Sequence, residues 1–251
     1  MGKIIAVANQ KGGVGKTTTS VNLSASLALN NRRVLIVDFD PQGMTTVGLG
    51  EKKEMKKGVY QALMNGVYIM DIVQPTELDN LHICPCSPEL AGFEAEIFSE
   101  EKREMRLKNT LSGVKNLFHY IFIDCPPSLS FLTINALSAA DSVLIPIQTE
   151  FFCMEGLPDL LRTLDEVRAY LNPSLHLEGI VLTMFDERTN LSKQVADEVR
   201  HSLGDMVFSS VIPRSVKLAE APGFGKPILL YDIKSKGAQS YLNLAREILS
   251  R

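Results

Sequence analysis

A glycine-rich segment near the start of the chain carries the residues best suited to hold a phosphate group. Residues 9–19 read Asn-Gln-Lys-Gly-Gly-Val-Gly-Lys-Thr-Thr-Thr, between an apolar run typical of a strand and an apolar-periodic run typical of a helix. Glycines allow successive backbone N–H groups to converge on phosphate oxygens, and a helix N-terminus adds partial positive charge. In such a loop Lys16 would reach the β- and γ-phosphates of a nucleotide, and the Thr17 hydroxyl would bind Mg²⁺.

This segment differs from the ordinary P-loop pattern at one position and carries an additional lysine. The usual pattern has a glycine five positions before Gly15, where this chain has Gln10. Instead, Gly12 and Gly13 lie just before the Val-Gly-Lys run, and Lys11 opens the loop. The plain motif therefore fails, and a variant of it with a second cation takes its place.

Carboxylates follow two other apolar runs of the chain. Asp38 and Asp40 stand after the second run, and side chains two positions apart at the end of a strand point the same way. Asp124 ends a later run and is followed by Pro126 and Pro127, which stop the strand. An apolar strand that ends in aspartate is a Walker B arrangement, which holds Mg²⁺ directly or through water.

The elements that must position these residues alternate along the chain. Short apolar runs rich in β-branched residues predict strands at Ile4–Val7, Val34–Val37, Leu81–Cys84, Tyr120–Ile123, Ser142–Pro146, Gly179–Thr183 and Val207–Ile212. Amphipathic or apolar stretches between and after them predict helices at Thr18–Leu29, Phe131–Ala139, Pro158–Leu171, Leu191–Leu203 and Ala238–Leu249.

This alternation predicts an α/β fold with a doubly wound, mostly parallel sheet and helices on both faces. Ligands of such sheets bind at the carboxyl ends of the strands, where every motif above falls. No repeat or long linker divides the sequence, so we expect residues 1–251 to form a single domain. The charged segments Glu51–Gly58 and Ser99–Arg106 are expected to be an exposed loop and a helix start. Further segments at strand ends offer positions for a nucleotide base or a dimer partner: Thr149–Phe152 with Glu155–Gly156, Thr183–Asp186 and Ile212–Arg214.

The Lys-Gly-Gly-Val-Gly-Lys-Thr-Thr run resembles the deviant Walker A box of the ParA/MinD family. The Asp-Phe-Asp-Pro-Gln-Gly segment at 38–43 and the Asp-Cys-Pro-Pro segment at 124–127 resemble further motifs of that family. The resemblance extends over nearly the whole chain and is strongest to the chromosomal ParA proteins, often called Soj. Where the family usually has asparagine, this chain has Met44, so the resemblance assigns that side chain no role.

The resemblance implies a P-loop NTPase fold and a Mg²⁺-dependent ATPase that dimerises around ATP. Lys11 would cross the dimer interface onto the partner's ATP, and Asp40 would help to organise the attacking water. The implied ATP contacts are Lys11, Gly12, Gly13, Val14, Gly15, Lys16, Thr17 and Thr18, with Pro213 bordering adenine. The implied Mg²⁺ residues are Thr17, Asp38 and Asp124.

The same resemblance implies partners: non-specific double-stranded DNA for the ATP-bound homodimer, and a ParB-type protein that stimulates hydrolysis and release. The protein would then be cytoplasmic and associated with the nucleoid. Ten Lys and Arg residues against six Asp and Glu residues lie between Arg188 and Arg251, which makes this part of the chain mildly basic. The candidate DNA contacts are Arg188, Lys193, Arg214, Lys217, Lys234 and Lys236, the first two beside a helix start and the others on loops.

Composition restricts the other function classes. A formal net charge of −3 does not indicate a nucleic-acid binder by itself, and 45% apolar residues exclude a disordered chain. The four cysteines (Cys84, Cys86, Cys125 and Cys153) form no Cys-x-x-Cys pair, so reduced thiols are expected rather than a zinc site or a disulfide framework. The N-terminus lacks signal-peptide organisation, and no apolar run approaches the roughly 18 residues of a membrane span.

Two alternatives within the same superfamily stay open. A MinD-like membrane-cycling ATPase would append a basic amphipathic helix, whereas residues 247–251 end a helix with a core-facing stripe, so no stable membrane association is expected. A metabolic or redox member, such as an amidoligase-like synthetase or a nitrogenase-iron-protein-like reductase, is the other alternative. A cluster-bridging reductase would need placed cysteines, and Cys125 and Cys153 show no cluster spacing.

Overall fold

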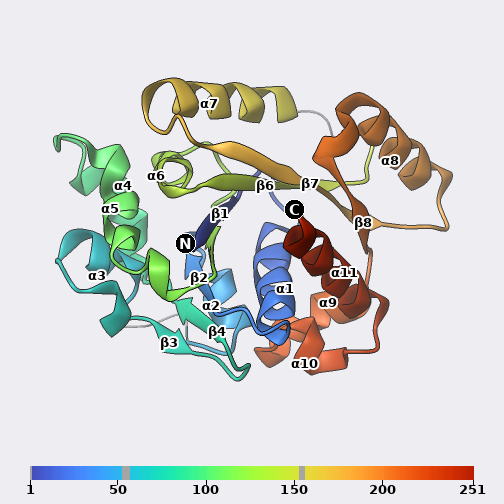
Figure 1. Cartoon of the computed structure of the whole chain (residues 1–251), viewed down its shortest axis with the longest axis horizontal. Helices are drawn as coiled ribbons and strands as arrows, with labels where there is room; N and C mark the ends of the chain where they lie inside the picture. The colour runs from blue at the N-terminus through green and yellow to red at the C-terminus, as the bar shows by residue number, and fades with distance from the viewer. Residues whose placement is uncertain (1, 53–56, 153–155) are drawn as a thin grey trace.

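The protein is built on one eight-stranded sheet. The computed structural model describes residues 2–52, 57–152 and 156–251. Its strands are β1 (Lys3–Val7), β2 (Val34–Asp38), β3 (Gln74–Pro75), β4 (Leu81–Cys84), β5 (Tyr120–Asp124), β6 (Ser142–Gln148), β7 (His176–Phe185) and β8 (Val207–Pro213). They lie in the order β3-β4-β2-β5-β1-β6-β7-β8, and every neighbouring pair is parallel except β3 with β4 (Figure 1).

Helices cover both faces of this sheet. They are α1 (Lys16–Leu29), α2 (Met44–Gly48), α3 (Val59–Met64), α4 (Phe93–Glu96), α5 (Arg106–Ser112), α6 (Phe131–Ala139), α7 (Leu157–Tyr170), α8 (Asn190–Leu203), α9 (Val216–Glu220), α10 (Ile228–Asp232) and α11 (Lys236–Ser250). One core cluster joins the sheet to α3–α8, and the other joins the opposite face to α1, α9, α10 and α11 (Figure 1). The continuously apolar strands are therefore buried on both sides, as their composition predicts.

The central strand β1 places the phosphate loop where the strand order reverses. From β1 the chain crosses to β2 and β4 on one side and returns through β5, and it then adds β6, β7 and β8 on the other side. In open parallel sheets such a reversal leaves a crevice at the carboxyl ends of the strands, because successive connections leave in opposite directions. The ends of β1, β2 and β5 meet at this edge, since Asp38 is in register with Asp124 and Val7 with Asp124.

The predicted fold class and all seven predicted strands are confirmed, with β7 and several other strands longer than expected. The sequence analysis missed β3, which has two residues, and α2, α3, α4, α9 and α10, which have four to six. Elements of one turn show too little periodicity to be recognised. Two placements of basic residues are corrected: Lys217 lies in α9 and Lys236 begins α11, not in loops.

The helix start expected within Ser99–Arg106 is found at Arg106. Part of the loop expected at Glu51–Gly58 (residues 53–56), together with Cys153 and Glu155, lies outside the described residues. In the described ranges, no helix combines the length and the apolar character that crossing a membrane requires.

Candidate functional site

The phosphate loop joins β1 to α1 and is pinned at two points. Gly13 and Gly15 have φ angles of 76° and 89°, in the left-handed region that side chains with a Cβ rarely adopt. The Thr183 hydroxyl donates to the Val14 carbonyl at 2.8 Å, and the Asn9 amide donates to the Pro146 carbonyl at 2.7 Å. The ends of β6 and β7 therefore fix the loop from one side.

Lys16 is the first residue of α1, and its ammonium lies inside the loop. Its Nζ donates to the Lys11 carbonyl at 3.0 Å, and the residue is only 6% exposed. Burial lowers the pKa of Lys16, although the nearby Asp124 carboxylate acts in the opposite direction. A buried ammonium that is hydrogen-bonded to a loop carbonyl suits an anionic ligand in the loop. Lys11 itself is half-buried at the start of the loop.

Asp124 collects hydroxyl groups from two helices. Its Oδ2 accepts from Thr17 at 2.8 Å and from Thr45 at 2.7 Å, and its Oδ1 accepts from Ser20 at 2.9 Å. Burial raises the pKa of this carboxyl, while the three hydroxyl donors oppose that shift. Carboxylate and hydroxyl oxygens form the donor set that Mg²⁺ prefers, so the residues present fit such an ion.

Sequence reasoning missed Ser20 and Thr45. Thr17 and Ser20 are three residues apart and share one face of α1, a spacing that the sequence does contain. Thr45 had no such signal, because α2 is a five-residue helix that reaches Asp124 only through the pairing of β2 with β5.

Asp38 lies beside Asp124 and is fully buried. Its Oδ2 accepts from the backbone N–H of Thr46 at 2.7 Å and from the Thr46 hydroxyl at 2.6 Å. Its Oδ1 has no hydrogen-bond partner among the described residues. Burial, reinforced by the Asp124 charge, raises the pKa of Asp38 to about 7. This carboxyl thus holds the start of α2, and its second, buried oxygen is available to a cation.

Asp40 borders a cavity of about 360 Å³ in front of the phosphate loop. Its Oδ1 accepts from the Gln42 N–H at 2.9 Å, and the residue is 9% exposed. The same cavity is lined by Gly12, Gly13, Gly15, Lys16, Thr17, Thr18 and the exposed Met44. Asp40 and Lys16 therefore face one space, whereas Asp38 does not line it.

A second cavity of about 360 Å³ lies on the other side of α1. Pro213 lines it, as do Tyr241 and Met184, the last with a φ of 52°. Gly15, Thr18 and Met184 line both cavities, so the two adjoin at the start of α1. An apolar hollow adjoining a phosphate loop has the character of a site for a nucleotide base.

The six candidate DNA contacts, here called the basic surface, lie at the β7, β8 and α11 end of the sheet. Arg188, Arg214, Lys234 and Lys236 line one open hollow, and Lys217 joins Arg214 and Lys236 around a smaller one. Lys193 lines neither and is exposed on α8.

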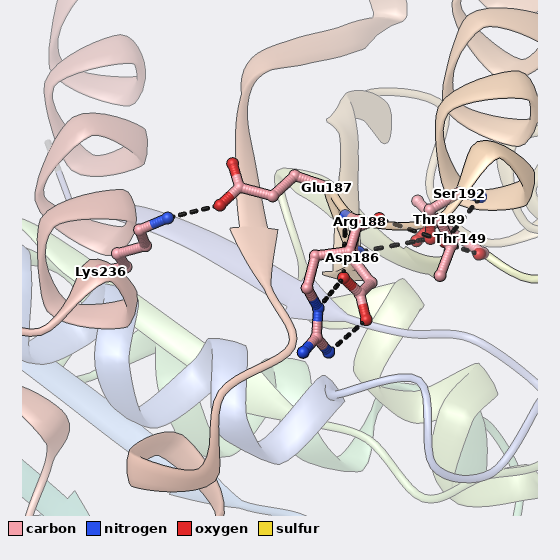
Figure 2. Close-up of polar contacts among 7 residues, drawn as sticks. All are labelled: Thr149, Asp186, Glu187, Arg188, Thr189, Ser192 and Lys236. Carbon is pink, nitrogen blue, oxygen red and sulfur yellow. Dashed lines mark hydrogen bonds and ion pairs between the residues drawn. The ribbon is translucent and has the colours of Figure 1, made fainter.

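Acidic side chains accompany three of these cations. Arg188 is paired with Asp186, Lys236 with Glu187 and Lys217 with Asp232 (the first two pairs in Figure 2). The hydrogen bonds from Arg188 lower the pKa of Asp186 to about 2, so this carboxylate is charged at neutral pH.

The chain matches known proteins over its whole length. A family profile described as "AAA domain" matches residues 2–177. The sporulation initiation inhibitor protein Soj of Bacillus subtilis (strain 168) is 54% identical over 249 residues, which cover 99% of this chain and 98% of that protein. The chromosome partitioning protein ParA of Myxococcus xanthus (strain DK1622) is 53% identical over 252 residues, covering 100% of this chain and 89% of that protein.

A solved structure agrees with these matches. The cobyrinic acid a,c-diamide synthase of Mycobacterium smegmatis, solved with bound ADP and magnesium, has a TM-score of 0.87 and 36% identity, covering 99% of this chain and 94% of that one. The synthase has the same fold as this chain, but the ParA and Soj proteins are more similar to this chain in sequence. Together with the phosphate loop and the Asp124 cluster, the matches show that the chain belongs to the ParA/MinD family, in the group of the ParA and Soj proteins.

Proposed function

We propose that the protein is a DNA-partitioning ATPase whose ATP-bound homodimer binds DNA without sequence preference. The observation that carries this proposal is the convergence of Lys16, Thr17 and Asp124 at the mouth of a phosphate loop. Relatives that are 53% and 54% identical over nearly the full chain are named ParA and Soj, and this supports the partitioning role.

In the proposed complex the loop from Lys11 to Thr18 holds the triphosphate, and the base lies in the cavity beside Pro213. Thr17 and Asp124, which are hydrogen-bonded to each other, would hold Mg²⁺, and Asp38, in register with Asp124, would contribute to its surroundings. A bound Mg²⁺ neutralises charge on the phosphate oxygens. Lys16 exchanges the Lys11 carbonyl for phosphate oxygens, which are better acceptors for a buried ammonium.

Hydrolysis needs a positioned water and charge neutralisation rather than a covalent intermediate. Asp40 shares the cavity with Lys16, is largely buried, and offers a carboxylate oxygen to a water near the phosphate end. We assign it the role of orienting the attacking water.

Lys11 supplies the second cation, from the partner subunit of the dimer. It opens the phosphate loop and is half-buried at the carboxyl edge of the sheet. A cation supplied in trans is worth roughly 10³–10⁵ in rate in other phosphoryl-transfer proteins. Lys11→Ala is therefore expected to lower ATP turnover by about 10³-fold and to remove its rise with protein concentration. The role of the dimer would be contradicted if Lys11→Ala kept both the wild-type turnover and its dependence on protein concentration.

Dimerisation also joins two copies of the basic surface. Phosphate contacts act jointly, so roughly 3 contacts per subunit give a slope of log affinity against log salt of about −5 for a dimer and about −3 for a monomer. ATP then controls DNA binding through dimerisation, and a ParB-type partner that stimulates hydrolysis releases the protein. A cytoplasmic, nucleoid-associated protein follows from this cycle.

The test is binding to mixed-sequence duplex DNA in ATP, in ADP and without nucleotide, across a salt series. Tight binding with the steeper slope in ATP alone is expected. Equal binding in all three conditions contradicts the switch and leaves the ATP site untouched. Sedimentation with liposomes in ATP is the matched comparison, because strong pelleting without DNA binding favours the membrane-cycling alternative.

A further inference from the structure

Three buried hydroxyl groups lie in a row between the phosphate loop and the start of α8. Thr183 belongs to β7, Thr149 follows β6, and Ser192 lies in the first turn of α8. Their exposed fractions are 2%, 2% and 5%. A hydroxyl buried to this extent is costly unless it is hydrogen-bonded, and each of these three is.

Hydrogen bonds of side chains and backbone connect the two ends of the row, with the step from the Thr183 hydroxyl to its carbonyl made within the residue itself. The Thr183 hydroxyl donates to the Val14 carbonyl of the phosphate loop at 2.8 Å. The Thr183 carbonyl accepts from the Thr149 backbone N–H at 3.1 Å and from its hydroxyl at 3.4 Å. The Ser192 hydroxyl donates to the Thr149 carbonyl at 3.2 Å and lies 3.1 Å from the Thr149 hydroxyl.

The far end of the row leads to the basic surface. The Asp186 N–H donates to the Ser192 hydroxyl at 3.3 Å, and the Thr189 hydroxyl accepts the Ser192 N–H as the N-cap of α8. The Asp186 carboxylate in turn accepts from the Arg188 N–H at 3.0 Å and from its Nε and Nη2 at 2.9 and 2.8 Å. Figure 2 shows Thr149 and Ser192 on one side of Asp186 and the Arg188 guanidinium on the other.

Two properties of this row make it suitable for transmitting a change. Its hydroxyls are inside the protein, where hydrogen bonds polarise one another and a broken link is costly. The row leads to Asp186, whose carboxylate accepts two hydrogen bonds from the Arg188 guanidinium. The orientation of the Arg188 side chain, which is 83% exposed, therefore depends on the backbone position of Asp186.

Resting on the proposed function, we propose that Thr149 and Ser192 are positioning residues that couple nucleotide in the phosphate loop to DNA binding by Arg188. A triphosphate orders the loop and with it the Val14 carbonyl, and the row extends this order to the start of α8. With a triphosphate in the phosphate loop, the Arg188 side chain is held in one orientation that suits a DNA phosphate. Without the triphosphate, this orientation is held less firmly. By linkage, DNA bound at Arg188 strengthens nucleotide binding by the same factor.

A row of contacts is not itself a demonstration of coupling, so the test measures coupling directly. Affinity for a mixed-sequence DNA duplex is determined in a non-hydrolysable ATP analogue and in ADP, for the wild type, Thr149→Val, Ser192→Ala and the double variant. The wild-type ratio of the two affinities is expected to be at least about tenfold. In Ser192→Ala the ratio is expected to fall by about threefold, since dimerisation still favours DNA binding in ATP, while affinity for the ATP analogue stays within about twofold. Ser192→Ala removes the hydroxyl that bonds both the Thr149 carbonyl and the Asp186 N–H, so it should lower the ratio most. Thr149→Val keeps the backbone bonds of Thr149 to Thr183 and Ser192 and should lower the ratio less, and the double variant should lose no more than Ser192→Ala.

Two controls separate coupling from a general loss of structure. Thr149→Ser keeps the hydroxyl and should retain the wild-type ratio. Ser26→Ala removes a buried hydroxyl that donates to the Asn22 carbonyl within α1, and this variant should also retain the ratio. If Thr149→Val does not fold, Ser192→Ala alone decides the matter.

The inference is overturned if Ser192→Ala folds and keeps the full ratio. It is overturned together with the proposed function if the wild type itself binds DNA equally in both nucleotides. The wild-type ratio therefore distinguishes the two failures.

Discussion

Lys16 in the phosphate loop and Arg188 on the basic surface are both cations in proposed binding sites, but their surroundings differ. Lys16 is buried, and its ammonium bonds a carbonyl five residues away in the same loop. Arg188 is exposed and is held by a carboxylate two residues away. Burial restricts the cation of the first region, whereas the cation of the second is oriented by a neighbouring carboxylate and would otherwise move freely in water.

This contrast indicates which interactions decide the energetics of each region. In the phosphate loop the desolvated groups interact strongly, so each one that is changed should have a large effect. On the basic surface salt and water screen each charge, so effects should be small individually and should add up over several residues.

The largest expected effect comes from Lys16→Ala. Without the ammonium, a triphosphate in the loop loses its buried cation, and ATP turnover is expected to fall by about 10³-fold. Steady-state hydrolysis measures the loss of turnover, and binding of a fluorescent ATP analogue measures the loss of affinity for the triphosphate. Lys108→Ala on α5, away from both cavities, is the matched control and should behave as the wild type. Wild-type turnover in Lys16→Ala would contradict the expectation that a single change in the phosphate loop has a large effect.

Asp38→Asn tests the buried acids of the loop region in nucleotide-free protein without Mg²⁺. The pKa of Asp38 is about 7 in the folded state and about 3.8 as its ordinary value, so the folded state disfavours the ionised form. The resulting loss of stability grows as pH rises from about 4 to 7 and is constant above that. Asparagine removes it, so the variant should be more stable by about 2 kcal/mol at pH 8, with a smaller gain at pH 4.5.

Urea unfolding at the two pH values measures this gain. Asp79→Asn, at an exposed carboxylate between β3 and β4, is the control and should show no comparable gain. A variant that is less stable at pH 8 than the wild type would mean that the Asp38 charge is compensated in the folded protein.

These two predictions rest on features that differ in how well the sequence foretells them. Lys16, Thr17 and Asp124 could be identified because a loop, a helix start and a strand end each leave a local pattern in the chain. The contact of Thr45 with Asp124 could not, since 79 residues separate them and only the sheet order brings them together. The expectation of a single domain, and the roles of the site residues, stay predictions.

The residues of the basic surface could be predicted from the sequence, but their pairing and positions in space could not. Charge counts indicate a basic C-terminal part, but the pairing of Lys236 with Glu187 joins positions 49 residues apart. Lys217 and Lys236 were expected in loops, because α9 is short and the start of α11 depends on the Ser235 N-cap, whose hydroxyl accepts the Ala238 N–H. Exposed charges carry little of the folding energy, so their positions leave no periodic signal.

Arg188→Ala tests the exposed side of the contrast. Removal of one phosphate contact reduces the slope of log affinity against log salt by about 1, so a dimer without both Arg188 side chains should show a slope smaller by about 2. Affinity should fall similarly for DNA of any sequence, since phosphate contacts carry no base information. Fluorescence anisotropy over a salt series measures both. Arg162→Ala, at an exposed arginine of α7 that is not among the candidate DNA contacts, should leave the slope unchanged. An unchanged slope in Arg188→Ala removes that residue from the DNA contacts.

Glu187→Gln should produce the smallest effect. Glu187 and Lys236 are both largely exposed, so the ion pair they form contributes little to folding, and the melting temperature should not change. DNA affinity in ATP should rise by about twofold at low salt, because the change removes a negative charge from the basic surface and frees Lys236 for phosphate. The gain should disappear at high salt, where screening hides both charges. Lower DNA affinity in the variant would show that Glu187 orients Lys236 for binding and does not compete with DNA for it. Glu187 would then act on Lys236 as Asp186 acts on Arg188.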